Sequence, residues 1–228
     1  MSLETVREEC HEQLKQLGRT RESLKLIAVS KLQPIEKIRR LHSAGHNIFA
    51  ENYVQEALLK QDTLKDLDIE WHFIGTLQKN KVKMVVGKFV LVHSVDSFEL
   101  ARAISNYAEK IKTTQKVLIQ VNLAQEITKG GFDGESLLKV WSEITALPGI
   151  EITGLMTMPP LTDDPEDVRP YFRQLRELQT ELLKQGAGRH PLHELSMGTS
   201  HDYHVAIEEG ATIVRLGTIL FGERPRKN

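Results

Sequence analysis

The sequence predicts an α/β protein built as a single TIM-type (β/α)8 barrel with an extra helix before the first strand. Three observations lead to this fold class. Short apolar runs recur eight times, helical patterns fill the stretches between them, and the 228 residues slightly exceed the roughly 200 that a closed barrel requires. No linker, low-complexity tract or charge block divides the chain, so residues 1–228 are expected to form one domain.

The eight expected strands are apolar on several consecutive positions, which is typical of strands buried on both faces of a parallel sheet. They fall at residues 25–30, 46–52, 69–75, 89–95, 116–122, 150–158, 193–198 and 212–218. An open flavodoxin-like sheet is the alternative, but it would use only about five or six of these runs and leave the others unexplained. A closed barrel accounts for all eight runs.

The segments between the strands carry apolar residues at helical spacing, and a further helical segment precedes the first strand. The expected helices cover residues 4–17, 34–44, 54–64, 80–86, 97–110, 135–147, 170–185 and 201–209. Asp96 and Glu99 resemble a capping box at the start of one helix. Gly45 and Gly210 stand where two other helices should end.

Composition argues against several classes of function. The 30 basic and 31 acidic side chains are interspersed and give a net charge of −1, so no field favours nucleic acid or an anionic membrane. No stretch approaches the ~18 apolar residues of a membrane span, and the charged N-terminal segment does not resemble a signal peptide. The single cysteine, Cys10, excludes an internal disulfide, which favours a cytoplasmic location.

Lys31 is the first candidate for chemistry, because functional groups of such barrels gather at the carboxyl ends of the strands. It follows the first apolar run directly, so its amine is expected at the barrel mouth. Desolvation and nearby cations lower the pKa of a lysine in such a place, and a neutral amine condenses with aldehydes. The alternative is a solvent-facing lysine that merely ends a strand, and position alone favours that alternative.

Two segments near the C-terminus have the composition of a phosphate site. Residues 196–200 (SMGTS) come at the end of the seventh run, and residues 215–218 (RLGT) at the end of the eighth. Barrels often bind phosphate with the loops after strands seven and eight, where backbone N–H groups, hydroxyls and glycines can approach the dianion. Simple turn formation would also explain these residues. The phosphate interpretation is favoured because both loops carry the pattern together.

A reactive lysine and a phosphate cradle facing each other match pyridoxal phosphate, which carries an aldehyde and a phosphate. Arg215 would then face the pyridine nitrogen. A guanidinium only donates hydrogen bonds, so the nitrogen would stay an unprotonated acceptor and the ring would be a weak electron sink. The alternative for Arg215 is a salt bridge inside the barrel to Glu51 or Asp202, and the sequence leaves both interpretations open.

Seven blocks, taken in order, resemble the signature segments of the pyridoxal phosphate homeostasis family. They are AVSK at 28–31, ENYVQEA at 51–57, WHFIGTLQKNK at 71–81, HSVDS at 93–97, VLIQVN at 117–122, SMGTSHDYHVAI at 196–207 and VRLGTILFG at 214–222. The blocks extend from the first expected strand to the last. The resemblance implies a barrel like the N-terminal domain of alanine racemase, with pyridoxal 5'-phosphate held as a Schiff base on Lys31.

The resemblance also implies roles for individual residues. Lys31 corresponds to the family's cofactor lysine, Arg215 to its ring-nitrogen arginine and Asn52 to an asparagine packed beside the cofactor. The implied phosphate-binding residues are Ser196, Gly198, Ser200, Gly217 and Thr218. Lys129, in the segment EITKGGF, resembles a loop lysine of the family, and the sequence leaves its role open.

The function implied by the resemblance is intracellular homeostasis of pyridoxal phosphate, without an established reaction and without catalytic residues. The expected partners are the cofactor and pyridoxal phosphate-dependent apo-enzymes, and the protein is expected to be a monomer. The alternative is a fold-type III enzyme such as a racemase or decarboxylase. Those enzymes carry a further β-domain, whereas this sequence ends shortly after the eighth run. A barrel acting on a sugar phosphate would keep the phosphate loops without using the lysine.

Clustered histidines raise the hypothesis of a metal site. His190, His193, His201 and His204 fall on elements that aim them differently, and no cysteine or fixed carboxylate pattern accompanies them, so no metal is expected. His72, inside an apolar run, is expected to be a hydrogen-bonded residue of the barrel interior and not a catalyst.

Overall fold

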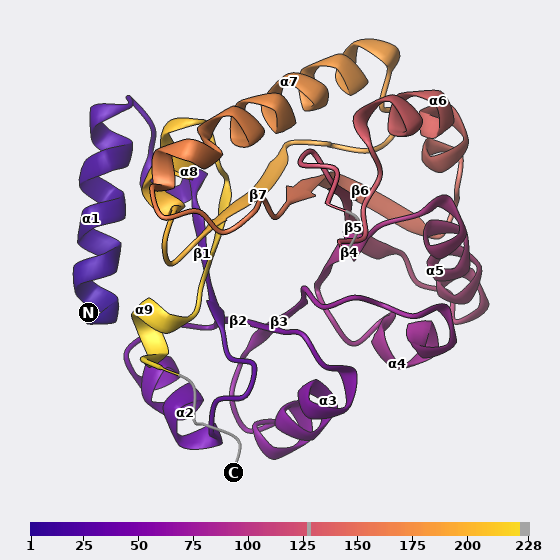
Figure 1. Ribbon diagram of the computed structural model, residues 1–228. Coiled ribbons are helices and arrows are strands. Elements are labelled where there is room, and N and C mark those ends of the chain that lie inside the picture. The colour runs from indigo at the N-terminus through magenta and orange to yellow at the C-terminus, as the bar shows by residue number, and fades with distance from the viewer. Residues whose placement is uncertain (127–128, 224–228) are drawn as a thin grey trace.

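The computed structural model describes residues 1–126 and 129–223, and its strands close into a barrel. Parallel strands pair in chain order around the ring, and β8 pairs with β1 to close it. The strands are β1 (Lys25–Val29), β2 (Ile48–Glu51), β3 (Glu70–Phe73), β4 (Leu91–Val95), β5 (Gln115–Val121), β6 (Ile150–Thr157), β7 (Glu194–Thr199) and β8 (Ile213–Leu216). Figure 1 shows the strand ring with the helices outside it. The fold class predicted from the sequence is confirmed.

Helices alternate with the strands and cover the outer face of the barrel (Figure 1). They are α1 (Leu3–Gln16), α2 (Ile35–Ser43), α3 (Val54–Thr63), α4 (Val82–Val85), α5 (Phe98–Lys110), α6 (Gly134–Thr145), α7 (Arg169–Gln185), α8 (Tyr203–Glu208) and α9 (Thr218–Phe221). Short 3-10 turns, Lys79–Lys81 and Pro165–Val168, lead into α4 and α7. Within the described residues, no helix combines the length and the apolar composition that crossing a bilayer requires.

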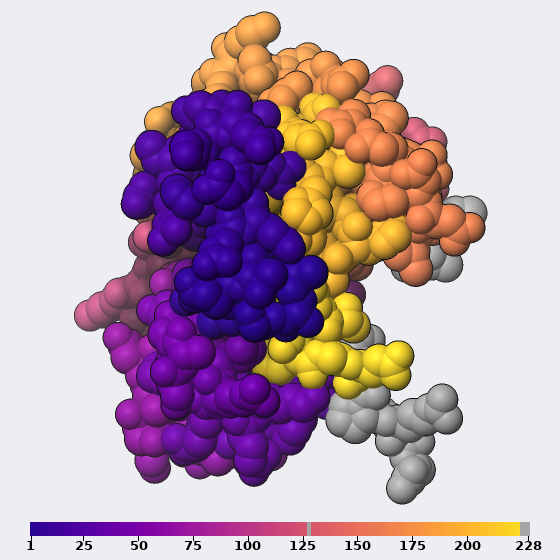
Figure 2. All heavy atoms as spheres, turned by 90° about the vertical axis from the view of Figure 1, so that its left-hand side faces the viewer, coloured from indigo at the N-terminus to yellow at the C-terminus, as the bar shows by residue number. Residues whose placement is uncertain are grey.

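Helix α1 is the expected extra helix, and it packs on the outside of the barrel against α8. Figure 2 shows it in indigo, lying beside the yellow C-terminal part of the chain. Tyr203 donates a hydrogen bond to Glu9 at 2.8 Å. Arg19, just after the helix, donates to the carbonyls of Ile207 and Ala211 at 3.0 and 2.7 Å. These bonds tie the N-terminal segment to the last turn of the barrel.

The alternation of side chains along each strand divides the core in two. A large apolar core fills the space between strands and helices. A smaller apolar cluster lies inside the barrel and contains Ile27, Ala50, Leu91, Leu118, Met156 and Ile213. By the same alternation, His93 and Arg215 also point inward, two residues beyond Leu91 and Ile213. A buried polar set therefore lies next to the apolar cluster, toward the carboxyl ends of the strands.

One helix start differs from the sequence-based expectation. The N-cap of α5 is Ser97, whose hydroxyl accepts the N–H of Leu100 at 3.3 Å, and Asp96 lies before the helix. The cap therefore lies one residue later than expected, and the proposed pairing of Asp96 with Glu99 as a capping box was wrong. Gly45 and Gly210 end α2 and α8 as predicted, with φ angles of +81° and +97° that favour glycine.

Candidate functional site

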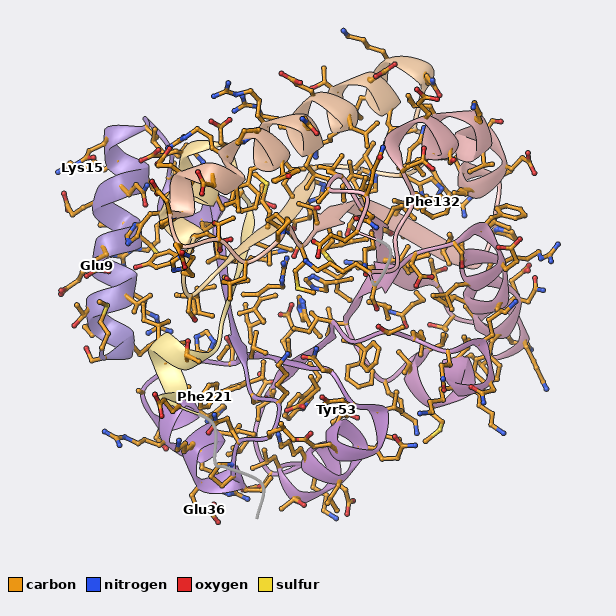
Figure 3. The ribbon with its side chains drawn as sticks, viewed as in Figure 1. Glu9, Lys15, Glu36, Tyr53, Phe132 and Phe221 are labelled. Atoms are coloured by element: carbon orange, nitrogen blue, oxygen red, sulfur yellow. The ribbon has the colours of Figure 1, made fainter. Side chains whose placement is uncertain are left out.

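A cavity of about 560 Å³ opens at the carboxyl ends of the strands. Figure 3 shows side chains filling the interior of the strand ring. Six of the residues singled out from the sequence line the cavity: Lys31, Asn52, Ser200, Arg215, Gly217 and Thr218. Met156, Met158 and Leu161 add apolar wall on one side. The cavity therefore combines an amine, a guanidinium, an amide and the hydroxyl groups of Ser200 and Thr218.

The turn that carries Lys31 is held by neighbouring carboxylates. Ser30 faces the outside of the barrel wall, where its hydroxyl donates to Glu51 Oε1 at 2.6 Å, and the next residue, Lys31, lines the cavity. Leu32 has a φ of +61°, a left-handed conformation that costs a non-glycine residue roughly 1–2 kcal/mol. Its N–H donates to Glu56 Oε1 at 2.7 Å. This bond stabilises the turn next to the lysine.

A buried ion-pair cluster lies behind the same turn. Lys60 Nζ, on α3, donates to Glu51 Oε1 at 2.7 Å, to Glu56 Oε1 at 2.6 Å and to the Ser30 carbonyl at 2.7 Å. Burial raises the pKa of the Glu51 carboxyl, and the Lys60 ammonium opposes that rise. Glu51 is thus paired with lysine and not with Arg215, a salt bridge considered from the sequence. This cluster was not predicted from the sequence.

Asn52 brings an unsatisfied acceptor to the cavity. Its Oδ1 atom is buried and has no hydrogen-bond partner among the described residues. A buried polar atom without a partner costs about 1–3 kcal/mol, so a ligand that donates a hydrogen bond there would recover that energy. Gly75 passes so close to the Asn52 carbonyl that a Cβ would clash with it, which explains the glycine at the end of the third apolar run.

The loops after β7 and β8 meet at a corner of the cavity. Ser200 Oγ accepts hydrogen bonds from the N–H groups of Gly217 at 3.0 Å and Ile219 at 3.4 Å. Two backbone donors therefore converge on one oxygen beside the Thr218 side chain, which also lines the cavity. Converging N–H groups and hydroxyls are suitable ligands for an anion.

Two residues expected in the phosphate site lie elsewhere. Gly198 has a φ of +89°, and a Cβ at this position would come within 2.6 Å of Ala206 Cβ, so glycine is needed for α8 to pack on β7. Ser196 is fully buried and points into the barrel. Its Oγ lies 2.7 Å from Arg215 Nη1 and 2.9 Å from His93 Nδ1. Neither residue lines the cavity.

Arg215 lies almost fully buried at the inner wall of the cavity. Its Nη1 donates to Ser196 Oγ at 2.7 Å and its Nη2 to the Thr157 carbonyl at 3.0 Å. Burial lowers the pKa of the guanidinium to about 10, against the attraction of Asp202, so it remains a cation at neutral pH. The Asp202 carboxylate itself accepts hydrogen bonds from Thr199, so the second salt bridge considered from the sequence is not formed either.

Lys129 ties two loops together beside the cavity. Its Nζ donates to Glu126 Oε1 at 2.6 Å and to the carbonyls of Met158 and Pro159 at 3.2 and 3.0 Å. Met158 lines the cavity, whereas Lys129 does not. Lys129 therefore connects the β5 loop to the β6 loop.

The comparisons with known proteins agree with this fold. The sequence matches the family described as alanine racemase, N-terminal domain, over residues 8–225. The structure resembles alanine racemase from Clostridium difficile with a TM-score of 0.72, covering 97% of this chain and 60% of that one; at 17% identity this likeness shows the fold alone. The chain is thus a barrel of the alanine racemase N-terminal domain class.

Two more similar proteins define the family within this class. A pyridoxal phosphate homeostasis protein from Aquifex aeolicus is 50% identical over 222 residues, which cover 97% of this chain and 95% of the relative. PipY of Synechococcus elongatus, solved with PLP bound, is 40% identical with a TM-score of 0.83, covering 93% of this chain and 100% of PipY. The chain belongs to the pyridoxal phosphate homeostasis protein family.

Proposed function

We propose that this protein binds pyridoxal phosphate at the mouth of its barrel and serves the homeostasis of that cofactor in the cytoplasm. The observation that carries the proposal is the meeting of Lys31, Asn52, Arg215 and the Ser200–Thr218 corner in one cavity of about 560 Å³. The name of the Aquifex relative and the pyridoxal phosphate bound to PipY support it. The cytoplasmic location rests on the absence of any disulfide partner for Cys10 in the sequence.

The residues present fit the cofactor. Bound pyridoxal phosphate supplies an aldehyde that a neutral lysine amine attacks, and the Lys31 side chain lines the cavity. Asn52 Oδ1 offers a buried acceptor without a partner in the part of the chain that the structure describes, and Arg215 offers a buried cationic donor for the ring nitrogen. The hydroxyls of Ser200 and Thr218 and the Gly217 backbone would hold the phosphate. Ser196, expected at the phosphate, supports Arg215 instead.

We further propose that the protein does not turn over amino acids. Removing the α-proton of an amino acid requires a strong electron sink and a positioned base. Arg215, whose pKa of about 10 keeps it protonated at neutral pH, can only donate to the ring nitrogen, which leaves the sink weak. Holding and releasing the cofactor is the role that remains.

Release to pyridoxal phosphate-dependent apo-enzymes, by a monomer, completes the proposal. The cavity rim carries Met158 and Leu161, whose surfaces are 48% and 87% exposed. Tyr53, at the start of α3, is 53% exposed and lies beside the strand ring in Figure 3. An apolar rim of this kind gives an acceptor enzyme a surface to contact while the cofactor leaves.

The test of the proposed function is the absorbance spectrum of the purified protein before and after borohydride, followed by peptide mapping. We expect one pyridoxyl adduct, on Lys31. Lys31→Ala should abolish it, and the matched control Lys129→Ala should not, because Lys129 does not itself line the cavity. Absence of bound pyridoxal phosphate in the native protein would overturn the function. A stoichiometric adduct on another lysine in Lys31→Ala would overturn the assignment of the residue.

A further inference from the structure

A chain of hydrogen bonds crosses the interior of the barrel from the cavity to the opposite end. Arg215 Nη1 lies 2.7 Å from Ser196 Oγ, and Ser196 Oγ lies 2.9 Å from His93 Nδ1. His93 Nε2 lies 2.9 Å from His72 Nδ1, and His72 Nε2 lies 2.8 Å from Glu70 Oε1. The first four residues are at most 5% exposed. Glu70 reaches a second cavity at the amino ends of the strands, where its side chain is 35% exposed.

The residues of this chain come from four strands and meet because each points inward. Ser196 lies on β7 and Arg215 on β8, while His93 lies on β4 and His72 on β3. Neither histidine lines the cofactor cavity at the carboxyl ends of the strands, and Ser196 does not line it either. The proposed cofactor contacts therefore do not explain why these three residues are present. Burying two imidazole rings in the barrel core costs free energy unless every ring nitrogen makes a hydrogen bond. Each ring nitrogen of His72 and His93 has a hydrogen-bond partner within 2.9 Å.

Glu70, at the exposed end of the hydrogen-bond chain, determines which nitrogen atoms carry hydrogen. The hydrogen bond from His72 holds the pKa of the Glu70 carboxyl below its usual range, so Glu70 is an ionised acceptor at neutral pH. The hydrogen bond to this carboxylate therefore requires a hydrogen on His72 Nε2, and the Nδ1 atom of a neutral imidazole with that hydrogen is an acceptor. That acceptor requires a hydrogen on His93 Nε2, which leaves His93 Nδ1 to accept from the Ser196 hydroxyl. All donors then point from Arg215 toward Glu70.

Burial supports the neutral state that this argument requires of His93. Desolvation lowers the pKa of the His93 imidazole well below its usual value, and the electrostatic effects of His72, Arg215 and Lys25 act in the same direction. A neutral imidazole has one donor nitrogen and one acceptor nitrogen, so its tautomer is set by its neighbours. Here the neighbours assign the hydrogen to Nε2.

The tautomer of His93 has a consequence for Arg215. A serine hydroxyl rotates freely, and it accepts well from a guanidinium only when its own hydrogen is directed elsewhere. His93 Nδ1 takes that hydrogen and so turns a lone pair of Ser196 toward Arg215 Nη1. The Thr157 carbonyl holds Nη2 at 3.0 Å. Two fixed acceptors define the plane of the guanidinium, and its orientation toward the cavity follows.

We propose that His93, held as the Nε2–H tautomer by His72, is a positioning residue that orients Arg215 through Ser196 toward the ring nitrogen of the bound cofactor. The hydrogen-bond chain is a property of the protein by itself. Its effect on the ring nitrogen rests on the proposed function, because Arg215 meets that nitrogen only when pyridoxal phosphate is bound. Two measurements separate these parts.

The first measurement is nitrogen NMR of the full-length protein labelled with ¹⁵N-histidine. We expect both His72 and His93 to carry hydrogen on Nε2 and not on Nδ1 near neutral pH. A scalar coupling across the N–H···N bond between the two rings should connect them. A hydrogen on Nδ1 of either ring would overturn the proposal, since Ser196 would then accept from His93. A doubly protonated His72 would overturn it as well, because His93 would reverse its tautomer.

The second measurement compares the affinities of pyridoxal phosphate and of its analogue in which C–H replaces the ring nitrogen. His93→Phe keeps a ring of similar size but removes both nitrogens, and it should weaken pyridoxal phosphate binding roughly tenfold, the effect of about one hydrogen bond. The analogue should bind this variant as well as it binds the native protein. Equal losses for the two ligands would show a merely structural role and overturn the proposal.

Two further variants complete the comparison. His93→Asn retains an acceptor at the position of Nδ1 and should recover most of the lost affinity, which also covers the case in which His93→Phe fails to fold. His193→Phe is the matched control, because this histidine is 62% exposed at the far end of the barrel, and it should change neither affinity. Failure of the native protein to bind either ligand would overturn both the link to the cofactor and the proposed function. The NMR result would still show whether the hydrogen-bond chain has the proposed direction.

Discussion

Replacing Lys60 by methionine should destabilise the protein through the carboxylate that it leaves behind. Lys60 is 5% exposed and donates to Glu51, Glu56 and the Ser30 carbonyl at 2.6–2.7 Å. Methionine matches the length and apolar character of the lysine stem but provides no donor. Removing one partner of a buried ion pair costs about 3–5 kcal/mol. For a chain of this size, each kcal/mol lowers Tm by roughly 2–4 °C, so a loss of about 6–20 °C is expected.

The effect should depend on pH with a definite sign. Burial raises the pKa of Glu51, so the native state binds more protons at this site than the unfolded chain does. Stability contributed at this site therefore falls as pH rises above the ordinary glutamate value of about 4.3. Lys60 opposes the rise, and without it the pKa of Glu51 moves higher. The stability difference between native protein and Lys60→Met should widen as pH increases through that range.

Urea unfolding at several pH values measures both effects. Lys65→Met is the matched control, because the Lys65 side chain is 80% exposed and its nearest carboxylate oxygen is 4.0 Å away. Adding Glu51→Gln to Lys60→Met removes the charge left without a partner and should restore part of the stability. If Lys60→Met unfolds like Lys65→Met at every pH, Glu51 is not a buried charge that depends on Lys60, and the reasoning fails.

Three further predictions concern the cofactor. Ser200→Ala should weaken pyridoxal phosphate binding about tenfold or more, since hydrogen bonds to charged groups contribute roughly 1.5–3 kcal/mol; unchanged affinity here and in Thr218→Val would place the phosphate elsewhere. Pyridoxal without phosphate should bind far more weakly than pyridoxal phosphate, and the difference in affinity between the two ligands should be smaller in Ser200→Ala. An unchanged difference would contradict the assignment of Ser200 to the phosphate site. Incubated with individual L-amino acids, the protein should neither form keto acid nor exchange the α-hydrogen for deuterium at the roughly 1–10³ s⁻¹ turnover rates of ordinary enzymes. Turnover in that range would make it an enzyme. Light scattering should give the mass of one chain.

The barrel could be predicted because its strands are buried on both faces, which leaves eight apolar runs in the sequence. The ends of the strands could not be predicted, because apolar residues continue past the last ladder bond. The run at 69–75 contains a strand of only four residues, Glu70–Phe73, although Ile69 and Ile74 flank it. The segment at 80–86 is helical as expected but begins as a 3-10 turn at Lys79–Lys81. Local propensity does not distinguish these two helix types.

The cavity lining could be predicted from a simple rule, since Lys31 and Arg215 stand at strand ends on the inward phase of the alternation. The cluster around Lys60 could not be found in this way. Its carboxylates belong to β2 and α3, and only the packing of that helix on the barrel brings Lys60 to Glu51. One signal was present: Glu51 directly follows the apolar residues Phe49 and Ala50, and it points toward the helix layer, where a buried charge needs a partner.

The segment SMGTS shows why composition alone assigns a phosphate loop too broadly. Strand β7 continues through Thr199, so the first serine lies inside the ladder and only the last one, Ser200, lies in the loop. Pairing between β7 and β8 shifts between Ser196 and Thr199, and the positive φ of Gly198 falls within that shift. No residue pattern predicts such a shift in register. Ser196 faces Arg215 inside the barrel, whereas Ser200 faces the β8 loop. Of the two serines of this motif, only Ser200 lines the cavity, and Ser196 reaches it through its hydrogen bond with Arg215.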